Sequence, residues 1–433
     1  MKFQAQRGTR DILPEEASRW RTLEKVVRDV SMRYGYGEIR LPIFEATELF
    51  SRAIGEETEI VKKEMYSFKD RGGREITLRP EGTAGVVRAF IEHKLYSSSK
   101  VTRLFYFGPM FRYDRPQAGR FRQFHQYGME LLGTSEPEAD AEIIELSRRI
   151  LTGAGIDDAE IKLNSVGCPL CRPNYNERIR QEVSKKLDRF CDECKIRYRD
   201  NPLRILDCKI ETCRGELRSM PPILDFLCHD CRVHFDAVKA RLSLLDIPFE
   251  IDPGLVRGLD YYTKTAFEIN HRLLGVQSAI GGGGRYDSLV KAYGGPDTPG
   301  VGYSGGCERV LDVLEALGRQ DAEASGLELF VVAAGEGARE KCFVLSSRLR
   351  EVFRTGVDLT SSSLQSQMKM ADKLGARFAA IVGEDELKSG TATIRNMVSG
   401  AQEKVSEGNL VERLKDLLGK PPHPTLSPEG EGL

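Results

Sequence analysis

The sequence lacks any long apolar stretch. None of its hydrophobic runs approaches the roughly 18 residues that a membrane-spanning helix requires. Residues 1–7 carry no apolar core of the kind found in a secretory signal peptide. We therefore expect a protein that makes no membrane contact and works in the cytoplasm.

The chain also has little net charge. Its 64 Lys and Arg residues and 65 Asp and Glu residues nearly cancel, which leaves a formal charge of −1. This balance excludes attraction of the whole molecule to nucleic acid, so local basic patches would have to bind any polyanion. With 433 residues and 40% hydrophobic residues, the composition indicates a globular protein of roughly two to four domains.

Familiar nucleotide-binding loops are missing. The glycine segments at residues 281–284 and 302–306 are not followed by the Gly-Lys-Ser/Thr of a Walker loop. The Gly335-Glu336-Gly337 turn lacks the third glycine of a dinucleotide fingerprint, because Glu340 stands in its place. The sequence also has no internal repeat. Any phosphate-bearing ligand must be bound by other groups.

The sequence does contain a predicted β-hairpin rich in arginine. Residues 104–111 and 124–132 form the two predicted strands, and alternation places Gln126 and Glu130 on one face. Apolar residues fall on both faces, which favours a sheet buried on one side and lining a pocket on the other over an ordinary hairpin with a solvated polar face. Guanidinium groups suit bidentate phosphate binding. The loop supplies Arg112, Arg115, Arg120 and Arg122.

Hydrophobic periodicity predicts the other elements of the N-terminal region. We expect helices over residues 14–34 and 136–153, and a strand over residues 39–44 that Pro42 interrupts. Because proline cannot donate to a β-ladder, this strand should lie at a sheet edge or at a molecular interface.

Two further segments carry polar groups suited to a ligand. Glu81 and Thr83 follow a predicted strand and could bind an ammonium group, but Thr83 could instead cap a helix over residues 84–93. Residues 255–263 place a cation, a carboxylate and two phenols on a predicted strand: Arg257, Asp260, Tyr261 and Tyr262.

The glycine segments predict strands that allow close approach of the backbone to a flat ligand. The second of them runs into a predicted helix over residues 306–317, which carries Glu308 and Arg309.

The composition changes abruptly between residues 166 and 246. Eight of the ten cysteines lie here, with many Lys and Arg residues, so we expect a separately folded, mainly helical insertion. Paired cysteines at such spacing resemble structural tetrathiolate zinc sites, and eight thiols would form two sites or one site with unused thiols. The pairs could instead be apolar filler in a metal-free insertion. The candidate ligands are Cys168, Cys171, Cys191, Cys194, Cys208, Cys213, Cys228 and Cys231.

The last part of the chain predicts a small parallel α/β domain. Strands are expected at residues 327–334, 356–360 and 378–382, alternating with helices. Four prolines between residues 421 and 433 predict a disordered tail.

Taken together, these segments resemble the histidine–tRNA ligase family of class II aminoacyl-tRNA synthetases. The resemblance covers nearly the whole chain, and the segment from Arg257 to Tyr262 is its most specific part. The matching segments are residues 7–11, 40–42, 79–83, 108–112, 122–126, 257–262 and 282–287.

The resemblance implies the fold and its domains. It implies an α+β catalytic domain with a mostly antiparallel sheet, made of residues 1–165 and 247–320, which the Cys-rich insertion at residues 166–246 interrupts. It also implies an anticodon-binding α/β domain over residues 327–420, and a homodimer with Pro42 in the dimer strand.

The resemblance further implies a role for individual residues. Histidine would be bound by Glu81, Thr83, Arg112, Gln126, Glu130, Arg257, Tyr261 and Tyr262. Arg112 would contact the α-phosphate of ATP, Arg309 the γ-phosphate, and Arg257 the reacting phosphoryl group, so Arg112 and Arg257 are the candidate catalytic residues. Arg115 and Gln117 would read the extra guanosine of the tRNA(His) acceptor stem.

The implied reaction is ATP-dependent charging of tRNA(His) with L-histidine through an adenylate, with Mg²⁺. Positioning and cations aimed at developing charge would provide the catalysis. A site that hydrogen-bonds imidazole rejects analogues by a factor on the order of 10⁴, so no editing domain is expected. The basic insertion would contact the acceptor stem, or it would simply carry a solvated basic face.

Two other functions fit parts of the sequence. A regulatory subunit of ATP phosphoribosyltransferase shares the resembling fold, but such relatives usually lose the loop arginines and the terminal domain that this chain keeps. A zinc-dependent nucleic-acid-binding protein would explain the cysteines and leave the polar hairpin unexplained.

Overall fold

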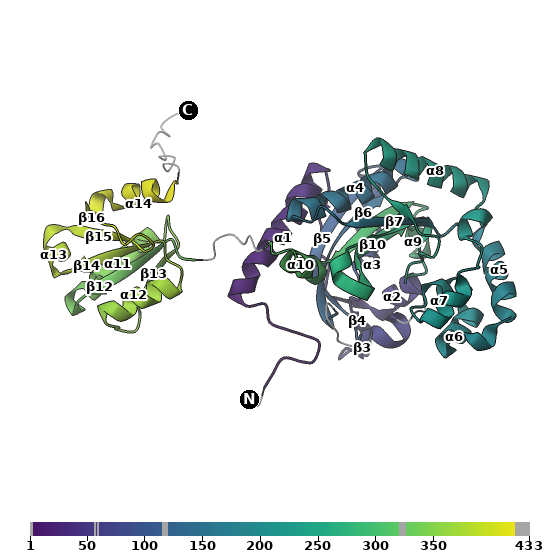
Figure 1. Cartoon of the computed structure of the whole chain (residues 1–433), viewed down its shortest axis with the longest axis horizontal. Coiled ribbons are helices and arrows are strands. Elements are labelled where there is room, and N and C mark those ends of the chain that lie inside the picture. Colours follow the sequence, from purple (N-terminus) through teal and green to yellow (C-terminus); the bar gives the residue numbers. More distant parts are fainter. Residues whose placement is uncertain (1–2, 56–57, 59, 115–119, 320–325, 421–433) are drawn as a thin grey trace. The chain divides into compact units, whose positions relative to one another are not determined.

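The computed structural model describes residues 3–55, 58, 60–114, 120–319 and 326–420. The chain forms two compact units, Met1–Ala322 and Glu323–Leu433 (Figure 1). Within the described residues, no helix combines the length and the apolar character needed to cross a membrane.

The first unit is built on an eight-stranded sheet in the order β1-β5-β6-β11-β10-β9-β7-β8. Pairing is antiparallel from β5 through to β7 and parallel only at the two edges. The mostly antiparallel sheet that the family resemblance implies is therefore confirmed. The strands are β1 (Gly37–Glu38), β5 (Thr102–Phe111), β6 (Gln123–Leu132), β7 (Glu160–Ser165), β8 (Glu250–Ile251), β9 (Thr263–Asn270), β10 (Ala279–Arg285) and β11 (Gly300–Gly306).

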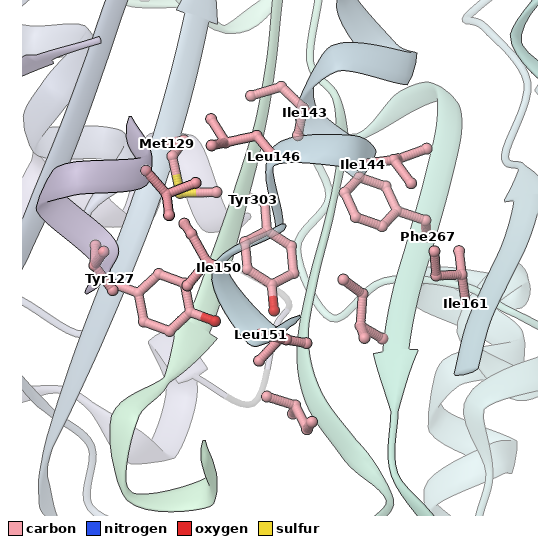
Figure 2. Packing of buried hydrophobic residues seen from close by; sticks show 14 of the residues in the cluster. Tyr127, Met129, Ile143, Ile144, Leu146, Ile150, Leu151, Ile161, Phe267 and Tyr303 are labelled. Atoms are coloured by element: carbon pink, nitrogen blue, oxygen red, sulfur yellow. The ribbon is translucent and has the colours of Figure 1, made fainter. Parts of the chain in front are cut away.

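Helices cover one face of this sheet. The helices are α1 (Pro14–Arg33), α4 (Pro137–Ala154), α8 (His229–Leu244) and α10 (Cys307–Ala316). Isoleucine and leucine side chains of α4 pack against Tyr127 and Met129 of β6, Tyr303 of β11 and Phe267 of β9 (Figure 2). Because alternate strand residues point to opposite faces, this apolar face leaves the other face of the same strands free for polar residues.

The predicted hairpin is confirmed as β5 and β6, and the helices predicted over residues 14–34 and 136–153 are confirmed as α1 and α4. The strand predicted over residues 39–44 is wrong, because residues 39–43 belong to no strand. Pro42 has no N–H to donate, and the carbonyls of Leu41 and Pro42 instead accept hydrogen bonds from Arg79 at 2.8 and 3.3 Å.

A smaller sheet lies beside this segment, in the order β2-β4-β3. Its strands are β2 (Phe44–Ala46), β3 (Tyr66–Lys69) and β4 (Glu75–Leu78). The short helices around it are α2 (Thr47–Ile54), the π-helix η1 (Ile60–Glu64), α3 (Thr83–Glu92) and the 3-10 turn η2 (Leu95–Ser97).

The Cys-rich insertion is helical, as predicted. Its elements are α5 (Arg172–Ser184), η3 (Leu187–Arg189), α6 (Asp192–Asp200), η4 (Pro202–Asp207), α7 (Glu211–Leu217) and η5 (Ile223–Phe226), followed by α8. Phe235, Val238 and Leu242 of α8 join the main core under α4, while Cys231 at the start of this helix packs with Cys171 of the insertion. Helix α8 therefore links the insertion to the large sheet.

The strand predicted over residues 255–263 is wrong. Residues 255–262 belong to no strand or helix, and β9 begins only at Thr263. The buried Asn164 holds the start of this segment, donating to the carbonyl of Leu255 at 2.9 Å. Because the Asn164 side chain, and not a neighbouring strand, donates to this backbone, the segment forms no β-ladder and Arg257 lies in a loop. The helix predicted over residues 306–317 is confirmed as α10, and the short helices η6 (Arg272–Gln277) and α9 (Leu289–Ala292) complete the unit.

The second unit has a five-stranded sheet in the order β13-β12-β14-β15-β16. The three predicted parallel strands are confirmed, but β15 and β16 add antiparallel strands that the sequence reading missed. The elements are β12 (Leu329–Ala334), η7 (Glu336–Ala338), α11 (Arg339–Leu349), β13 (Thr355–Val357), α12 (Leu364–Lys373), β14 (Phe378–Gly383), α13 (Glu384–Ser389), β15 (Thr391–Asn396), β16 (Gln402–Ser406), η8 (Glu407–Asn409) and α14 (Leu410–Leu418). The tail predicted over residues 421–433 lies outside the described residues.

Candidate active site

The face of the large sheet opposite α4 is polar and rich in glycine. One row of cross-strand partners runs from β5 to β9 through Tyr106, Gly128, Ser304, Gly282 and Glu268. Because alternate residues share a face, the rows two residues away lie on it as well. They contribute Gly108, Gln126 and Gly306 on one side, and Glu130, Gly302 and Gly284 on the other.

The buried carboxylate of Glu130 lies on this face. Its Oε1 accepts a 2.6 Å hydrogen bond from the Thr83 hydroxyl, and its Oε2 accepts one from the Tyr286 hydroxyl. Gly302 leaves room for the carboxylate, because a Cβ at that position would lie 1.8 Å from Oε2. The side chain is therefore held by donors from α3 and from the end of β10.

Burial raises the pKa of Glu130 to about 8, because desolvation outweighs the two donated hydrogen bonds. Burial also raises the pKa of the neighbouring Glu81 carboxyl, whose charge raises the pKa of Glu130 further. Two buried carboxyl groups with raised pKa values are typical of a functional site.

Thr83 is not the N-cap of a helix. Helix α3 begins at Thr83 itself, and its hydroxyl bonds to Glu130 instead. Glu81 fills the capping role, because its carboxylate accepts hydrogen bonds from the backbone N–H groups of Thr83 at 2.7 Å and Ala84 at 2.9 Å. The cap fixes the first turn of α3 and so directs the Thr83 hydroxyl toward Glu130.

Arg257 lies across the sheet over Gly282. A Cβ at Gly282 would come within 2.4–2.5 Å of the guanidinium atoms, so only glycine admits this side chain. The guanidinium donates to Glu268, the cross-strand partner of Gly282, and lies 5.9 Å from the centroid of the Tyr262 ring. The loop cation is therefore anchored on the polar face even though its backbone forms no strand.

Arg112 follows β5 directly and points back onto the same face. Its Nε donates to the carbonyl of Pro80 at 2.8 Å, next to Glu81, and its guanidinium lies 5.3 Å from the centroid of the Phe124 ring. Burial lowers the pKa of Arg112, while the carboxylates of Glu64 and Glu81 act in the opposite direction.

Arg309 extends from the first turn of α10. Its guanidinium donates to the carbonyl of Ala279 at 2.6 Å, at the start of β10. The buried Glu308 beside it accepts the backbone N–H of His125 at 2.9 Å and contacts the His125 ring at 3.1 Å. These contacts fix the start of α10 against β6 and β10.

The three arginines share neighbours. Burial lowers the pKa of both Arg112 and Arg309, and the positive charge of Arg120 lowers each further. The negative charge of Glu268 acts on both Arg309 and Arg257. The geometry agrees: Arg257 lies over Gly282, Arg309 lies beside Gly306, where a Cβ would be 3.5 Å from its Cδ, and Arg112 follows β5. Guanidinium groups from three distant segments therefore lie at one polar face, and such groups suit phosphate binding.

Aromatic rings and open hydrogen-bonding groups complete the site. Tyr261 packs against Tyr262 and edge-on against Tyr286, with ring centroids 4.8 and 5.7 Å apart. Among the described residues, the buried Gln126 Oε1 and Arg257 Nε have no hydrogen-bond partner. Buried polar atoms normally have one, so these two atoms are suited to a bound ligand.

Sequence reasoning missed Tyr106, Glu268 and Tyr286 as individual site residues. Tyr286 lies within a motif that had been noted, but its bond to Glu130 joins residues 156 positions apart. Tyr106 and Glu268 could have been found by alternation along β5 and β9, once the neighbouring strands were known. Arg115 and Gln117 lie outside the described residues.

The eight candidate cysteines form two groups of four. The first group is Cys168, Cys171, Cys228 and Cys231, and the second is Cys191, Cys194, Cys208 and Cys213. Within each group all sulfur atoms lie within 4.8 Å of one another, and the closest pairs are 3.7 to 3.9 Å apart. Four Zn–S bonds of about 2.3 Å in a tetrahedron give sulfur–sulfur distances of about 3.8 Å. Both groups therefore have the donor set and spacing of a tetrathiolate zinc site.

Comparison with protein-family models gives two matches. A model described as histidyl-tRNA synthetase matches residues 8–172 and 209–310, and one described as anticodon binding domain matches residues 328–417. The residues between 172 and 209, which include Cys191, Cys194 and Cys208, fall outside the first match.

The chain is also similar to curated proteins over nearly its whole length. It is 49% identical over 419 residues to a histidine–tRNA ligase of Halothermothrix orenii, covering 96% of this chain and 100% of that protein. It is 50% identical over 407 residues to a histidine–tRNA ligase of Moorella thermoacetica, covering 94% and 96% of the two chains.

Among solved structures, apo S. aureus histidyl-tRNA synthetase matches with a TM-score of 0.80 and 38% identity, covering 95% of this chain and 100% of that one. A Bacillus halodurans protein described as an ATP phosphoribosyltransferase regulatory subunit/histidyl-tRNA synthetase matches with a TM-score of 0.64 and 19% identity, covering 88% and 98%. The second likeness concerns the fold alone. From these matches and from the motifs in its sequence, the chain belongs to the histidine–tRNA ligase family of class II aminoacyl-tRNA synthetases.

Proposed function

We propose that this protein is an enzyme that charges tRNA(His) with L-histidine at the expense of ATP, through a histidyl-adenylate intermediate. Family membership supports the reaction. The observation that carries the proposal is one polar sheet face that holds Arg112, Arg257 and Arg309 as well as the buried Glu130. Cations for a triphosphate lie there beside acceptors for a free amino acid.

The amino acid would occupy the space bounded by Glu130 and the two loop tyrosines. Glu81, Thr83 and Glu130 offer acceptors for the ammonium group and an imidazole N–H, and the unpartnered Gln126 Oε1 offers another. Tyr261 and Tyr262 would close over the ring, and Arg112 and Arg257 would hold the carboxylate. A site built on such hydrogen bonds discriminates against analogues that lack them.

ATP would lie with its phosphates among the arginines. Arg112 would contact the α-phosphate, and Arg309 the γ-phosphate. Arg257 would face the reacting phosphoryl group from its place over Gly282. Within the described part of the chain, the two residue groups able to hold a metal are both made of cysteine, so Mg²⁺ would be bound mainly through the substrate phosphates.

The chemistry needs positioning and positive charge rather than covalent catalysis. A histidine carboxylate oxygen attacks the α-phosphorus, the bond to the β-phosphate oxygen breaks, and diphosphate leaves. The terminal adenosine hydroxyl of the tRNA then attacks the acyl carbon, and AMP leaves. Buried guanidinium groups aimed at the phosphoryl oxygens stabilise the charge that develops in the first step.

The tRNA would contact parts of the chain outside the sheet. Arg115 and Gln117 would read the extra guanosine of the acceptor stem, and basic residues of the insertion would bind acceptor-stem phosphates. The second unit, which the anticodon-binding model matches, would bind the anticodon.

We further propose a homodimer. Ile43, Phe44 and Phe68 are 45%, 58% and 49% exposed on or next to the edge strands β2 and β3. Exposed apolar side chains grouped in this way mark an interaction surface, and they lie next to Pro42. Light scattering at micromolar concentration checks this, and a particle of 48.5 kDa would contradict it.

The cysteine groups support two smaller proposals. Each would bind one structural Zn²⁺, because four thiolates fit this ion. No disulfide joins any of the ten cysteines, all of which lie in the described part of the chain, and cysteines persist as thiols or metal ligands in a reducing compartment, so we assign the protein to the cytoplasm. Metal analysis of dialysed protein should find two zinc ions per chain.

Charging assays test the main proposal. The purified chain should incorporate labelled histidine into tRNA(His) only with ATP, and should exchange labelled pyrophosphate into ATP only with histidine. Arg257→Ala should lower the exchange rate by about 100-fold or more, since it removes a buried cation from the reacting phosphate. The exposed Arg74 provides a control, and Arg74→Ala should retain the rate.

A folded, pure sample that charges no tRNA and exchanges no pyrophosphate would contradict the proposal. That result would favour a regulatory role on the same fold.

A further inference from the structure

The insertion contacts the loop that carries the site residues Arg257, Tyr261 and Tyr262. We call residues 255–262 the catalytic loop. Its backbone is not held by a β-ladder, so its position depends on other contacts. Two arginines of the insertion, Arg172 and Arg204, donate hydrogen bonds to its carbonyl groups.

Arg172 holds the end of the catalytic loop. Its guanidinium donates to the carbonyl of Tyr262 at 2.5 Å, and also to the carbonyls of Val166 and Gly167 at 3.2 and 3.3 Å. One side chain thus joins the loop to residues 166–167, which directly precede the first cysteine pair. The Tyr262 carbonyl is one residue from the Tyr261 ring and five from Arg257.

Arg204 holds the middle of the loop. It donates to the carbonyl of Gly258 at 2.7 Å and to the Asp260 carboxylate at 3.1 Å. Asn201 donates to the same Asp260 oxygen at 3.0 Å. The residue following Arg257 is therefore fixed from η4 of the insertion.

The insertion and the catalytic loop also make apolar contacts. Val256 and Tyr262 of the loop belong to the same buried cluster as Ile205 and the cysteines of the second group. Leu259 and Tyr261 pack against that cluster. The insertion and the catalytic loop thus share one hydrophobic cluster. We expect a shift of the insertion backbone to move the loop as well.

Both anchors are attached directly to the cysteine groups. Arg172 follows Cys171, and the backbone N–H of Cys168 lies 3.1 Å from the Cys171 sulfur. Gly167 has a positive φ of 66°, and a Cβ there would lie 2.8 Å from the same sulfur. Arg204 lies in the helical turn η4, which ends just before Cys208.

The first group joins the two ends of the insertion, because Cys168 and Cys228 lie 60 residues apart in sequence and 3.8 Å apart at sulfur. The second group joins α6 and α7 around η4. A zinc ion would join the four cysteines of each group by direct bonds. Without the metal the same thiols are held only by packing, so metal removal should loosen the chain around both groups.

We propose that zinc bound by the two cysteine groups holds the catalytic loop in place through Arg172 and Arg204, so that histidine activation depends on zinc bound outside the proposed histidine and ATP site. This inference rests on the proposed function. Arg172 and Arg204 are positioning residues, because they contact the loop backbone and not the substrates.

The test compares Arg172→Ala with Arg178→Ala, a change on the same helix at an exposed ion pair with Glu182. Zinc content, amide hydrogen exchange of the catalytic loop and histidine-dependent pyrophosphate exchange are measured for each. Arg172→Ala should keep two zinc ions, expose the loop amides, and lower kcat/KM for histidine by about 10- to 100-fold, the loss expected for one charge-assisted hydrogen bond. The KM for ATP should change less, since Arg112 and Arg309 stay in place.

Three further samples complete the experiment. Arg172→Lys should restore part of the activity, because an ammonium group can still donate to one carbonyl. Arg204→Ala should give the same loop exposure without loss of zinc. Wild-type protein depleted of zinc by a chelator should show both effects, and added Zn²⁺ should reverse them.

Several results would overturn the inference. These are wild-type kinetics in both arginine variants, an unchanged exchange pattern of the loop after zinc removal, or protein that holds no zinc and is fully active. If zinc-loaded wild-type protein shows no histidine-dependent exchange, the proposed function fails instead, while the zinc content and the loop protection still decide the coupling.

Discussion

At the scale of single residues, the site is organised around Glu130. The carboxyl group is 1% exposed, and its two oxygens accept hydrogen bonds from Thr83 and Tyr286. Desolvation nevertheless raises its pKa to about 8. Without bound histidine, the carboxyl group therefore changes charge near pH 8.

This property predicts a pH dependence. If the ionised carboxylate accepts the imidazole N–H, kcat/KM for histidine should rise with pH and level off above about pH 8, because kcat/KM reports the free enzyme. Pyrophosphate exchange at low histidine and saturating ATP measures it. Glu130→Gln should lose activity and flatten the rise, whereas the exposed control Glu92→Gln should keep both. An unchanged profile in Glu130→Gln would assign the titration to another group.

Only some of the contacts between site residues could be predicted from the sequence. Alternation along one strand was enough to place Gln126 and Glu130 on a common face. It could not show that Glu81 caps α3, or that Glu268 meets Arg257, because those contacts join separate segments. The position of Arg257 over Gly282 could not be predicted either, because sequence order does not show which glycine lies under which side chain.

At the scale of elements, one buried ion pair ties α4 to the sheet. Arg285 at the end of β10 donates to both oxygens of Asp140 and to the carbonyls of Thr134 and Glu136, and both side chains are fully buried. Burial would raise the pKa of Asp140, but Arg285 and His234 lower it to about 2. The pair therefore stabilises the fold at pH above about 4, and its contribution is lost as the pH falls toward 2.

Removing one partner should be costly. Arg285→Met removes the guanidinium from the buried Asp140 carboxylate and leaves only His234 beside it, which lowers the free energy of unfolding by about 3–5 kcal/mol. Arg241→Met breaks the exposed pair that joins α8 to Glu138 on α4, and should cost about 1 kcal/mol or less. Urea unfolding followed by Trp20 fluorescence measures both, because the single tryptophan lies in the core of the first unit. Equal losses in the two variants would contradict the argument.

Elements with a strong period were predicted well, and irregular ones were not. The apolar stripe of α1 and the alternation of β5 and β6 carry their own signal. Residues 255–262 look like a strand because they are rich in apolar and aromatic residues, but tertiary contacts from Asn164, Arg172 and Arg204 hold them as a loop. The antiparallel strands β15 and β16 were missed because they carry few apolar residues: their sequences are Thr-Ala-Thr-Ile-Arg-Asn and Gln-Glu-Lys-Val-Ser.

At the scale of the whole molecule, the two units have separate cores. The buried clusters of the first unit draw on residues up to Leu317, and those of the second begin at Leu327, within the described residues. In the second unit, Lys420 pairs with Glu328 at 2.8 Å, so the two ends of that unit are joined. Each unit therefore has a hydrophobic core of its own, as a domain does.

This separation predicts that the two half-reactions respond differently to truncation. A chain ending at residue 319 keeps every described residue of the proposed histidine and ATP site, so pyrophosphate exchange should persist. Charging of tRNA(His) should fall by about 100-fold or more, because the linked second contact with the tRNA is gone. Raising the tRNA concentration should recover part of the charging rate, since the loss is one of affinity. Equal loss of exchange and charging would mean that the first unit depends on the second for its own structure, and Trp20 fluorescence would then report a less stable core.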